Sequence, residues 1–407
     1  MVSQKAHLSR SERDCAPCSR SFLRNHRFAD FLRDDQIYMK KKKNPVRDFF
    51  YPPGKLPLED LTGLLSRYTQ ADPRLVVKPG IGRDACVLSF GDRYLVAKTD
   101  PVTFASDEIG WYAVQVNAND IASMGGIPRW FLAALLLPEG RTNLRMVEKI
   151  FDQISRACQD LGIVLCGGHT EITLGLERPI VVGQMLGEAE PGLLPAPERI
   201  LPGDEILLTK GIAIEGTALI AREKKGLEKK LGGGRLRKCR AFLKTPGIGV
   251  VREARVAMRS GEVHAMHDPT EGGLATGLLE WAWAAEVGLL VEREKIPVLP
   301  ETEILCRELS LDPLGLIASG ALLIAAPPPE AAKIKKALRR EGIPVEAIGR
   351  FWEKEKGIKI SAGGLMRDLP VFARDEIARF FEGSKAESPP STQRLQRERG
   401  QRLKEKP

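Results

Sequence analysis

The sequence predicts an α/β protein with two or three folded domains. Its 407 residues fit that number if a domain holds about 150 residues. Hydrophobic residues make up 43% of the chain and aromatic residues only 6%, a balance typical of globular proteins with helices packed on sheets. Helix-like and strand-like segments alternate along the second half, and a Pro- and Gly-rich stretch at 188–205 predicts a domain boundary.

Basic residues are concentrated at the two ends of the chain, whose formal net charge is +9. Residues 1–50 hold 12 Lys/Arg and 6 Asp/Glu, and residues 383–407 hold 7 and 3. The stretch 51–382 holds 43 basic and 44 acidic residues and is nearly neutral. We therefore expect a disordered basic extension at 1–50, a disordered basic tail at 383–407, and no specific nucleic-acid partner.

The chain lacks the sequence features of membrane and secreted proteins. No apolar run reaches the ~18 residues that a transmembrane helix needs, and the first thirty residues contain no hydrophobic core of a signal peptide. The seven cysteines are scattered and odd in number, which favours reduced thiols over a disulfide framework. These observations predict a cytoplasmic protein with no membrane partner.

The first folded domain is predicted over 56–190. Apolar residues at helical spacing predict helices at 56–68, 107–124 and 143–161, the second of which has no wide solvated face. Short apolar or alternating runs, bounded by Gly, Pro or Asp, predict strands at 86–90, 94–99, 128–138 and 178–187, and 162–173 predicts a strand that runs into a glycine loop. The first two strands are joined at Gly91-Asp92, which predicts an antiparallel hairpin.

The second folded domain is predicted over 200–352, from alternating patterns of the same two kinds. Its predicted helices are 214–223, 248–260, 272–286, 300–309 and 329–341. Its predicted strands are 205–209, 262–266, 321–325 and 344–350, and we expect the last to close the domain. The basic, glycine-containing stretch at 225–244 predicts a mobile loop or a frayed helix.

The predicted helix at 107–124 carries polar side chains in apolar surroundings. Asn117 and Asp120 are three residues apart and share a face, and Asn119 lies between them. Burying a carboxylate and carboxamides without partners is unfavourable, so we expect a cation or a ligand beside them. Asp84 enters the first strand of the predicted hairpin and Asp100 leaves the second, which brings both to one end.

These three acids are candidate ligands for one or two Mg²⁺ ions. Mg²⁺ prefers oxygen ligands and is commonly held by a few carboxylates together with substrate phosphates. The sequence therefore predicts a metal site at Asp84, Asp100 and Asp120. The alternative for each residue is a cap of a turn or a helix, a position that Asp favours.

Two glycine-containing segments are candidates for phosphate binding. In CGGHTEIT, Gly167 and Gly168 follow a buried strand and would let the backbone approach a ligand closely. His169 and Glu171 are two residues apart, so they point the same way if the strand continues.

The second segment, HDPTEGG, precedes a predicted helix. Free N–H groups and the helix dipole at such a start favour an anion, and the residues concerned are Asp268, Thr270, Gly272 and Gly273. The alternative is an Asp/Thr helix cap with glycines for tight packing. His264 and His267 are close by, and a structural role is favoured over a catalytic or zinc-binding pair.

Two common nucleotide motifs are excluded. No G-x-x-x-x-G-K-[ST] sequence occurs, so the chain is not a P-loop protein. Gly80-x-Gly82-x-x-Ala85 resembles a dinucleotide fingerprint but precedes a strand instead of linking a strand to a helix.

Seven motifs in a fixed order carry a resemblance to a known superfamily. They are GIGRDA, KTDPV, GWYAVQVNANDIASMGG-x-P, CGGHTEIT, PGDEILLTKGIAIEGTALIA, HDPTEGGLA and DPLGLIASG. Over about 56–352 the chain resembles the aminoimidazole ribonucleotide (AIR) synthase superfamily, which includes a thiocyanate-forming hydrogenase maturation factor, selenophosphate synthetase and thiamine-monophosphate kinase. It is most similar to the hydrogenase-maturation-like, AIR synthase-related branch.

The resemblance implies two α/β domains and a homodimer in which the N-terminal domains pair through their sheets. It implies ATP in a cleft lined by the dimer interface and the glycine segments, with Asp84, Asp100 and Asp120 holding Mg²⁺ and the phosphates. Asp84, Asp120, His169 and Glu171 are the candidate catalytic residues. The candidate cofactor-binding residues are Gly82, Arg83, Lys98, Asn117, Asn119, Gly167, Gly168, Thr170, Asp268, Thr270, Gly272 and Gly273.

The chain departs from the family pattern at three places. Many relatives have two acids where this chain has Arg83 and Asp84, and this Arg could contact phosphate directly. His169 stands where several relatives have Asp or Glu, so it could bind phosphate or act on the substrate, with Glu171 as the replacement acid. The chain ends in KEKP, without the terminal cysteine that receives the carbamoyl group in the hydrogenase maturation factor.

The function that the resemblance implies is ATP- and Mg²⁺-dependent phosphorylation that activates a small or protein-borne acceptor. Arg83, Lys98 and Lys210 are candidates for a cation that neutralises the developing charge. One alternative is a thiamine-phosphate-type small-molecule kinase. Another is a nucleotide-binding dimer without catalysis that acts in maturation or assembly.

Overall fold

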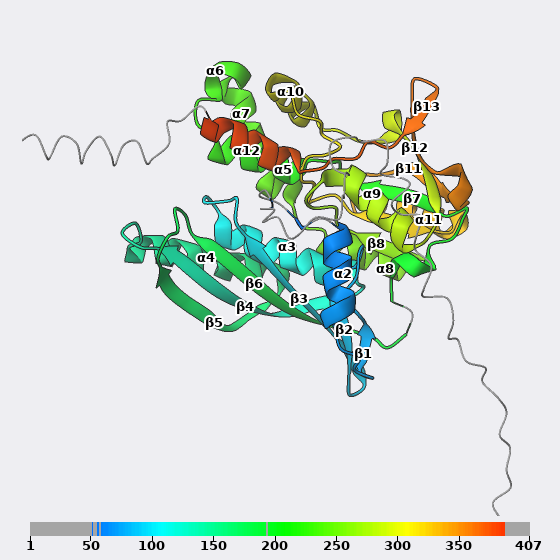
Figure 1. Ribbon diagram of the computed structural model, residues 1–407, viewed down its shortest axis with the longest axis horizontal. Coiled ribbons are helices and arrows are strands. Elements are labelled where there is room, and N and C mark those ends of the chain that lie inside the picture. Colours follow the sequence, from blue (N-terminus) through cyan, green and yellow to red (C-terminus); the bar gives the residue numbers. More distant parts are fainter. Residues whose placement is uncertain (1–50, 52–54, 57, 193, 387–407) are drawn as a thin grey trace, which may run out of the picture. The chain divides into compact units, whose positions relative to one another are not determined.

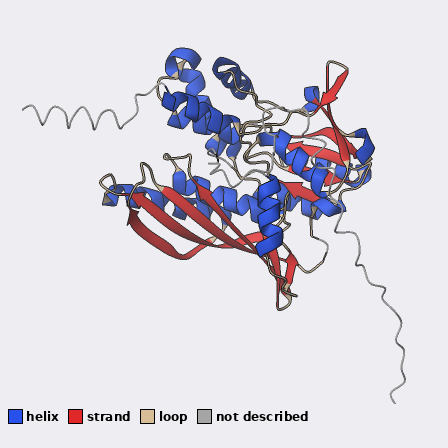
Figure 2. Ribbon diagram, viewed as in Figure 1, coloured by secondary structure: helices blue, strands red, loops and turns tan. Residues whose placement is uncertain are grey.

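The computed structural model describes residues 51, 55–56, 58–192 and 194–386 (Figure 1). The predicted extension at 1–50 lies outside the described residues, as does the predicted tail apart from 383–386, which are helical. A six-stranded sheet and a seven-stranded sheet each carry packed helices (Figure 2). The predicted mixed α/β class is confirmed.

The first sheet has the strand order β1-β2-β3-β6-β4-β5. Its strands are β1 (Leu75–Val77), β2 (Cys86–Phe90), β3 (Arg93–Val102), β4 (Ile127–Pro138), β5 (Val164–Thr173) and β6 (Ile180–Ala189). Neighbouring strands are antiparallel except β4 and β5, which are parallel. Helices α3 (Ile109–Ser123) and α4 (Leu144–Leu161) lie along one face of this sheet, and α2 (Leu58–Tyr68) precedes it in the chain (Figure 1).

Helix α3 is enclosed by protein, as its sequence predicts, and every residue in it except Trp111 is buried. Two glycines of β6 allow helix α3 to approach the sheet closely. A Cβ at Gly183 would lie 2.3 Å from Asn117 Nδ2, and one at Gly187 would lie 2.3 Å from a methyl of Ile121. The polar side chains of α3 are therefore fixed directly beneath the sheet.

The second sheet has the order β13-β12-β9-β11-β7-β10-β8. Its strands are β7 (Glu205–Thr209), β8 (Ala265–His267), β9 (Gly288–Glu292), β10 (Leu323–Ala326), β11 (Val345–Trp352), β12 (Ile358–Ala362) and β13 (Leu365–Asp368). Only the β12–β9 pair is parallel. The helices of this part are α5 (Ile214–Glu223), α6 (Glu228–Leu231), α7 (Gly233–Ala241), α8 (Val251–Ser260), α9 (Gly273–Ala284), α10 (Pro300–Leu309), α11 (Pro328–Arg340) and α12 (Glu376–Ala386).

Two sequence predictions are wrong in detail, and one pair of alternatives is decided. The stretch 225–244, predicted as a mobile loop or a frayed helix, forms the helices α6 and α7, whose Leu231, Leu236 and Cys239 are buried in a core cluster. The strand at 344–350 does not close the domain, because β12, β13 and α12 follow it. Gly167 and Gly168 lie within β5 and not in a loop after it.

A sheet contact explains the glycine at 168. Strand β5 runs close beside β4, and a Cβ at Gly168 would lie 2.0 Å from the carbonyl oxygen of Ala133. The requirement for glycine there comes from this backbone approach.

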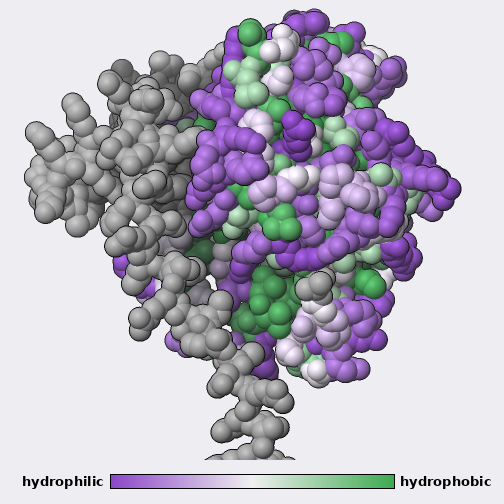
Figure 3. All heavy atoms as spheres, turned by 90° about the vertical axis from the view of Figure 1, so that its right-hand side faces the viewer, coloured by the Kyte–Doolittle hydropathy of each residue, from purple (hydrophilic) through white to green (hydrophobic). Residues whose placement is uncertain are grey.

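None of the helices in the described ranges is long and apolar enough to cross a bilayer. The face drawn in Figure 3 is largely hydrophilic, with apolar side chains in small groups and one larger group low in the view.

Candidate functional site

Four aspartates from different segments form an acidic cluster. Asp84 precedes β2, Asp100 lies in β3, Asp120 lies in α3, and Asp268 follows β8. Asp84 and Asp100 raise the pKa of Asp120, and Asp120 and Asp84 raise the pKa of Asp268, so these carboxyls lie near one another. Three segments far apart in the sequence, predicted to converge through Asp84, Asp100 and Asp120, do come together here.

Asp84, His267 and Asp268 form a compact group within the acidic cluster. Asp84 Oδ1 lies 2.7 Å from His267 Nδ1, and Ser123 Oγ donates to Asp268 Oδ1 at 3.4 Å. Asp84, His267 and Asp268 each offer a ligand atom, and these three atoms lie within 4.8 Å of one another. The second carboxylate oxygens of Asp84 and Asp268 are buried and have no hydrogen-bond partner in the described part of the chain.

Lys98, in β3, is shared by the other two acids. Its Nζ lies 3.0 Å from Asp120 Oδ2 and 3.8 Å from Asp100 Oδ2. Burial disfavours the charge on Lys98, but Asp120 and Asp100 outweigh burial and raise the pKa of this lysine. Lys98 and Asp120 therefore form an ion pair between a half-buried lysine and a buried aspartate, in which each side chain compensates the other.

Burial and like-charge repulsion raise the pKa of Asp120 and of Asp268. Burial is the main cause for Asp120, and repulsion from Asp84 and Asp100 adds to it, so that its pKa rises to about 7 despite Lys98. Burial, followed by repulsion from Asp120 and Asp84, holds the pKa of Asp268 well above its usual range. A hard divalent cation at this point would favour the ionised carboxylates and satisfy their free oxygens.

His267 lies between two acids. Its Nε2 is 3.5 Å from Glu280 Oε2 in α9, on the side of the ring opposite Asp84. Burial disfavours a charged imidazole, but Asp84 and Glu280 raise the pKa of His267 well above 6.5. A protonated imidazole has no free lone pair, so His267 in this state orients Asp84 by hydrogen bonding and does not coordinate a metal.

Asn117 and Asn119, both predicted to bind cofactor, hold backbone groups in this structure. Asn117 Nδ2 donates to the carbonyls of Ala113 at 2.8 Å and of Asp100 at 3.3 Å. Asn119 donates to the carbonyl of Ile248 at 2.9 Å and accepts from the N–H of residue 250 at 2.8 Å. Both carboxamides therefore fix the segments around the acidic cluster.

The glycine segment before α9 lies beside the same acids. Gly272 and Gly273 have φ of +82° and +63°, and a Cβ at Gly273 would lie 2.5 Å from the carbonyl oxygen of Leu314. Their N–H groups donate to Asp375 Oδ2 at 2.6 Å and to the carbonyl of Thr270 at 3.0 Å. These two amides, predicted to be free for an anion, are thus used within the chain.

A lysine and a glycine with positive φ lie close to this segment and to α9. Lys55 Nζ donates to Thr270 Oγ1 at 3.3 Å and lies 3.4 Å from Glu271 Oε2. Gly82 adopts φ +68°, and a Cβ there would contact the backbone of Glu280 at 3.5 Å. The turn that presents Asp84 is therefore packed directly against α9.

The predicted site residues on β5 lie apart from the cluster within one chain. His169 Nε2 is 3.3 Å from Glu171 Oε2, so the two side chains share a face, as predicted, and both are exposed. The strand register places Gly168 in line with Asp100, across β6 and β4. Three strand spacings of about 4.8 Å separate these two positions, or roughly 14 Å. Strand β5 also carries Gly167 and Thr170.

Two candidate cations are paired elsewhere. Arg83 forms an ion pair with Glu198. Lys210 is buried, lies 2.9 Å from Glu253 Oε1, and donates to two backbone carbonyls at 3.1 and 2.6 Å. Of the three cations named from the sequence, Lys98 is the one in contact with the predicted metal ligands.

Sequence reasoning left three residues out of the site. His267 directly precedes Asp268, and that adjacency is a signal that could have included it. Glu280 follows Gly273 by seven residues, a spacing of two helical turns that places both on one face of α9. Lys55 precedes the first predicted helix, and no pattern in the sequence connects it to Thr270.

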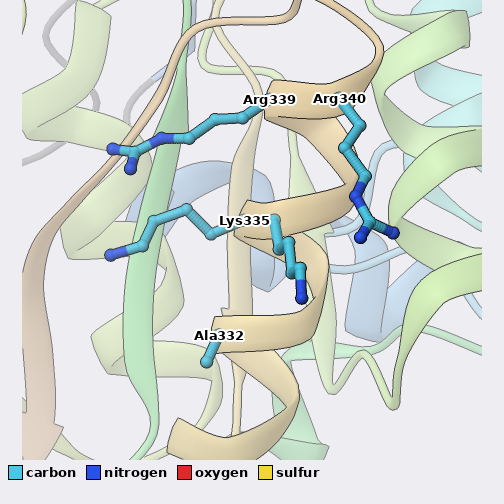
Figure 4. Close-up of a pocket in the computed structure, with 5 residues that line it drawn as sticks. Ala332, Lys335, Arg339 and Arg340 are labelled. Atoms are coloured by element: carbon cyan, nitrogen blue, oxygen red, sulfur yellow. The ribbon is translucent and has the colours of Figure 1, made fainter.

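Two surface pockets of the described residues lie outside this cluster. One follows the basic face of α11, where Lys335, Arg339 and Arg340 extend from a single helix (Figure 4). Another lies near the start of α3, where Lys244 Nζ stands 3.1 Å from the centroid of the Trp111 ring. Neither contains an aspartate of the cluster.

Comparison with protein families matches both parts of the chain. The profile of the AIR synthase related protein N-terminal domain matches residues 82–189, and that of the C-terminal domain matches residues 202–361. The carbamoyl dehydratase HypE of Rhodobacter capsulatus is 31% identical over 313 residues, which cover 76% of this chain and 84% of that protein. The chain belongs to the AIR synthase-related family.

Other members of the AIR synthase-related family show the same likeness. The carbamoyl dehydratase HypE of Rhizobium leguminosarum bv. viciae is 29% identical over 276 residues, or 65% of this chain and 75% of that protein. A crystal structure of the hydrogenase maturation protein HypE in complex with ATP aligns with a TM-score of 0.60 and 22% identity, over 77% of this chain and 91% of that chain. The chain lies in the HypE-type branch of the family and shares its fold.

Both family domains contribute to the acidic cluster. Asp84, Asp100 and Asp120 lie in the part that matches the N-terminal domain, and His267 and Asp268 lie in the part that matches the C-terminal domain. The cluster is therefore assembled only when the two parts of the family fold pack together.

Proposed function

We propose that this chain is an ATP- and Mg²⁺-dependent enzyme that phosphorylates, and so activates, a small or protein-borne acceptor. The observation that carries the proposal is the convergence of Asp84, Asp100, Asp120 and Asp268 around Lys98 and His267. A structural neighbour whose fold this chain shares was solved with ATP, and relatives are named carbamoyl dehydratases, which supports a nucleotide-dependent reaction.

The donor set fits Mg²⁺. It consists of carboxylate oxygens, the ligands that Mg²⁺ prefers, and two of them are buried without a partner. We infer that Asp84 and Asp268 hold the ion, with Asp100 and Asp120 completing the site toward the nucleotide. When bound, Mg²⁺ neutralises charge on the phosphates.

The side chains of this chain would position the substrates and neutralise the negative charge of the phosphates. In phosphoryl transfer the bond from the γ-phosphorus to the β,γ-bridging oxygen breaks, the bond from the γ-phosphorus to the acceptor atom forms, and ADP leaves with the bridging oxygen. Lys98 lies where it can pair with the transferred group once Asp120 engages the cation. His267 holds Asp84 in a fixed orientation, and Lys55 adds a positive charge beside Thr270.

Calorimetric titration with a non-hydrolysable ATP analogue and Mg²⁺ tests the site. We expect Asp84→Asn and Asp120→Asn to weaken analogue binding by about tenfold or more, because each removes a charge that faces the cation. Asp92→Asn, in the exposed turn at the other end of the same hairpin, is the matched control and should bind as the unaltered chain does. Unchanged affinity in both site variants would contradict the proposal.

The reaction products distinguish an enzyme that activates its acceptor by phosphorylation from a kinase that leaves the acceptor phosphorylated. A thiamine-phosphate-type kinase leaves a stable phosphorylated product, whereas an activating enzyme releases ADP and inorganic phosphate with a changed acceptor. A chain that binds the analogue but never turns ATP over with any acceptor would instead be a nucleotide-binding maturation or assembly partner.

We further propose that the protein is a homodimer in the cytoplasm. Helices cover one face of the first sheet, and the other face of β4 presents the half-buried apolar residues Leu132, Ala134 and Leu136. Strand β5 is an exposed edge, which in a lone chain would invite pairing with other chains. Free thiols at Cys86, Cys158, Cys166, Cys239 and Cys306 are consistent with a reducing compartment.

A further inference from the structure

Two helices that pack on the second sheet are strongly basic. Helices α8 and α11 together hold eight basic and two acidic residues, although the stretch 51–382 as a whole is nearly neutral. All eight basic residues are exposed or half-exposed, and they are Arg252, Arg255, Arg259, Lys333, Lys335, Lys336, Arg339 and Arg340. These two helices form the basic helix pair.

The basic helix pair is antiparallel and is fixed at both ends. Arg252, at the start of α8, donates to the carbonyl of Glu341 directly after α11 at 2.7 Å. The N–H of Glu262, after the end of α8, donates to Glu330 Oε2 at the start of α11 at 3.2 Å. The side chains between the helices are buried in one core cluster, which contains Ala254, Ala257, Ala331, Ile334 and Leu338. The basic side chains therefore stand on a rigid support.

Most of these cations have no acid to pair with. Three of the eight form ion pairs within the chain, at 2.7, 2.8 and 3.0 Å, and the pairs are Lys333–Glu330, Arg252–Glu341 and Arg339–Glu346. Among the described residues, no carboxylate forms an ion pair with the other five, which are Arg255, Arg259, Lys335, Lys336 and Arg340. The pair of helices therefore presents an excess of positive charge that a partner could compensate.

An open pocket of about 380 Å³ follows α11 between these charges, and its lining residues are Ala332, Lys335, Lys336, Arg339 and Arg340. Lys335 and Arg339 are four residues apart, as are Lys336 and Arg340, so each pair forms a row with a spacing of about 6 Å along the helix. Arg339 and Arg340 extend to different sides of the helix and do not converge on one point (Figure 4). Separated rows of cations suit an extended polyanion better than a single compact anion.

We propose that the basic helix pair is a docking surface for an acidic segment of a partner protein. An extended segment places every second side chain on one face, at intervals of about 6.6 Å, which is close to the spacing within the two cation rows. Five of the eight cations are arginines, each of which can bind a carboxylate through two parallel N–H groups. This inference does not depend on the proposed ATP-dependent reaction.

Other anionic partners fit the basic helix pair less well. Single-stranded nucleic acid is commonly held by aromatic side chains that stack on its bases, and neither helix contains an aromatic residue. Binding in a membrane surface needs apolar side chains that insert, whereas Ile334 and Leu338 of α11 are buried in the core. A second copy of the chain would bring like charges together, and the net-basic ends 1–50 and 383–407 would be repelled.

Fluorescence anisotropy of a labelled peptide of five Glu-Ser repeats, titrated with the full chain, tests this surface. We expect saturable binding that weakens as salt is added, because salt screens the attraction between exposed charges. A peptide of Gln-Ser repeats should not bind. The combined variant Lys335→Glu, Lys336→Glu and Arg340→Glu should weaken binding of the acidic peptide by about tenfold or more, because attraction becomes repulsion.

A second triple variant is the matched control. Lys229→Glu, Lys230→Glu and Arg237→Glu, at exposed positions of α6 and α7, make the same change in net charge. This control should bind the peptide within about twofold of the unaltered chain, and it retains any contribution of the basic chain ends. ATP-analogue binding should be unchanged in both variants, so that failure of this inference would leave the proposed function intact. Equal peptide affinity in the two triple variants would overturn the inference. Tighter binding of an oligothymidylate or of phosphatidylserine vesicles than of the peptide would overturn it as well.

Discussion

Glu215 shows what a single buried carboxyl does to the molecule before any ligand arrives. Burial raises its pKa to about 8, with repulsion from Glu271 and Asp375 adding to burial and Ser319 opposing it. Below pH 4.5, the pKa of the Glu215 carboxyl in the unfolded chain, the group is protonated in the folded and the unfolded states and does not lower the free energy of unfolding. Between pH 4.5 and 8 the unfolded chain ionises this carboxyl while the folded chain keeps it protonated, so stability falls as the pH rises and levels off above pH 8.

We therefore expect Glu215→Gln to increase the free energy of unfolding at alkaline pH. The gain should approach zero near pH 4.5 and reach on the order of 3 kcal/mol at pH 9, because glutamine keeps the shape and never ionises. Urea unfolding of both proteins at pH 5, 7 and 9, without nucleotide, measures this difference. A gain that is the same at all three pH values would show that the carboxyl is not titrating in this range.

At the scale of single elements, the start of α9 depends on a glycine with no substitute. Gly273 has φ +63°, and a Cβ would lie 2.5 Å from the carbonyl oxygen of Leu314 and 2.8 Å from that of Leu316. Gly273→Ala should lower the free energy of unfolding by roughly 2–4 kcal/mol, because strain and a backbone clash act together. Gly234→Ala, in α7, places its Cβ in open space and should be stabilising by about 0.5–1 kcal/mol.

Thermal unfolding and ATP-analogue titration of the two glycine variants check this expectation. Gly273→Ala should also weaken analogue binding, because Thr270 and Gly272 are in the same turn as the clash. Equal melting temperatures for the two variants would mean that the turn can rearrange around a side chain.

Elements with a strong local pattern were predictable from sequence, and elements defined by long-range packing were not. Helix α3 has apolar residues on every side, and this pattern identifies an enclosed helix without any tertiary knowledge. The stretch that forms α6 and α7 has a basic, glycine-containing sequence typical of a loop, yet Leu231 and Leu236 dock into a core made by other segments. Strand β5 continues through Gly167 and Gly168 because β4 supplies hydrogen-bonding partners along its length.

The same division applies to the site. Asp84 and Asp100 could be placed at one end of a hairpin because the turn between their strands was visible in the sequence. The contact of Asp84 with His267 joins residues 183 positions apart, and only the packing of the two family domains creates it. Local rules give candidate ligands, whereas the tertiary fold decides which charges they meet.

At the scale of the whole molecule, the helices of the described residues cover only one face of the first sheet. In β4 the side chains from Phe131 to Leu137 alternate between buried residues and half-buried apolar ones, and α3 and α4 cover a single face. On β5, Val164 and Ile172 are 58% and 57% exposed. An open apolar face next to an exposed edge strand is the surface that a second copy of the chain would cover.

We expect light scattering to give a mass about twice 44.9 kDa for the unaltered chain, since an isologous pair is the commonest closed assembly. Val164→Lys combined with Ala134→Lys should shift the mass toward 44.9 kDa, because charges on the open face of the sheet oppose association while the buried core side chains are unchanged. Leu144→Lys, at an exposed position at the start of α4 on the covered side of the sheet, should leave the dimer intact. If the nucleotide site is completed by His169 and Glu171 of the partner subunit, the monomeric variant will also lose analogue affinity. A monomeric mass for the unaltered chain, or a dimer that survives the double substitution, would rule out this interface.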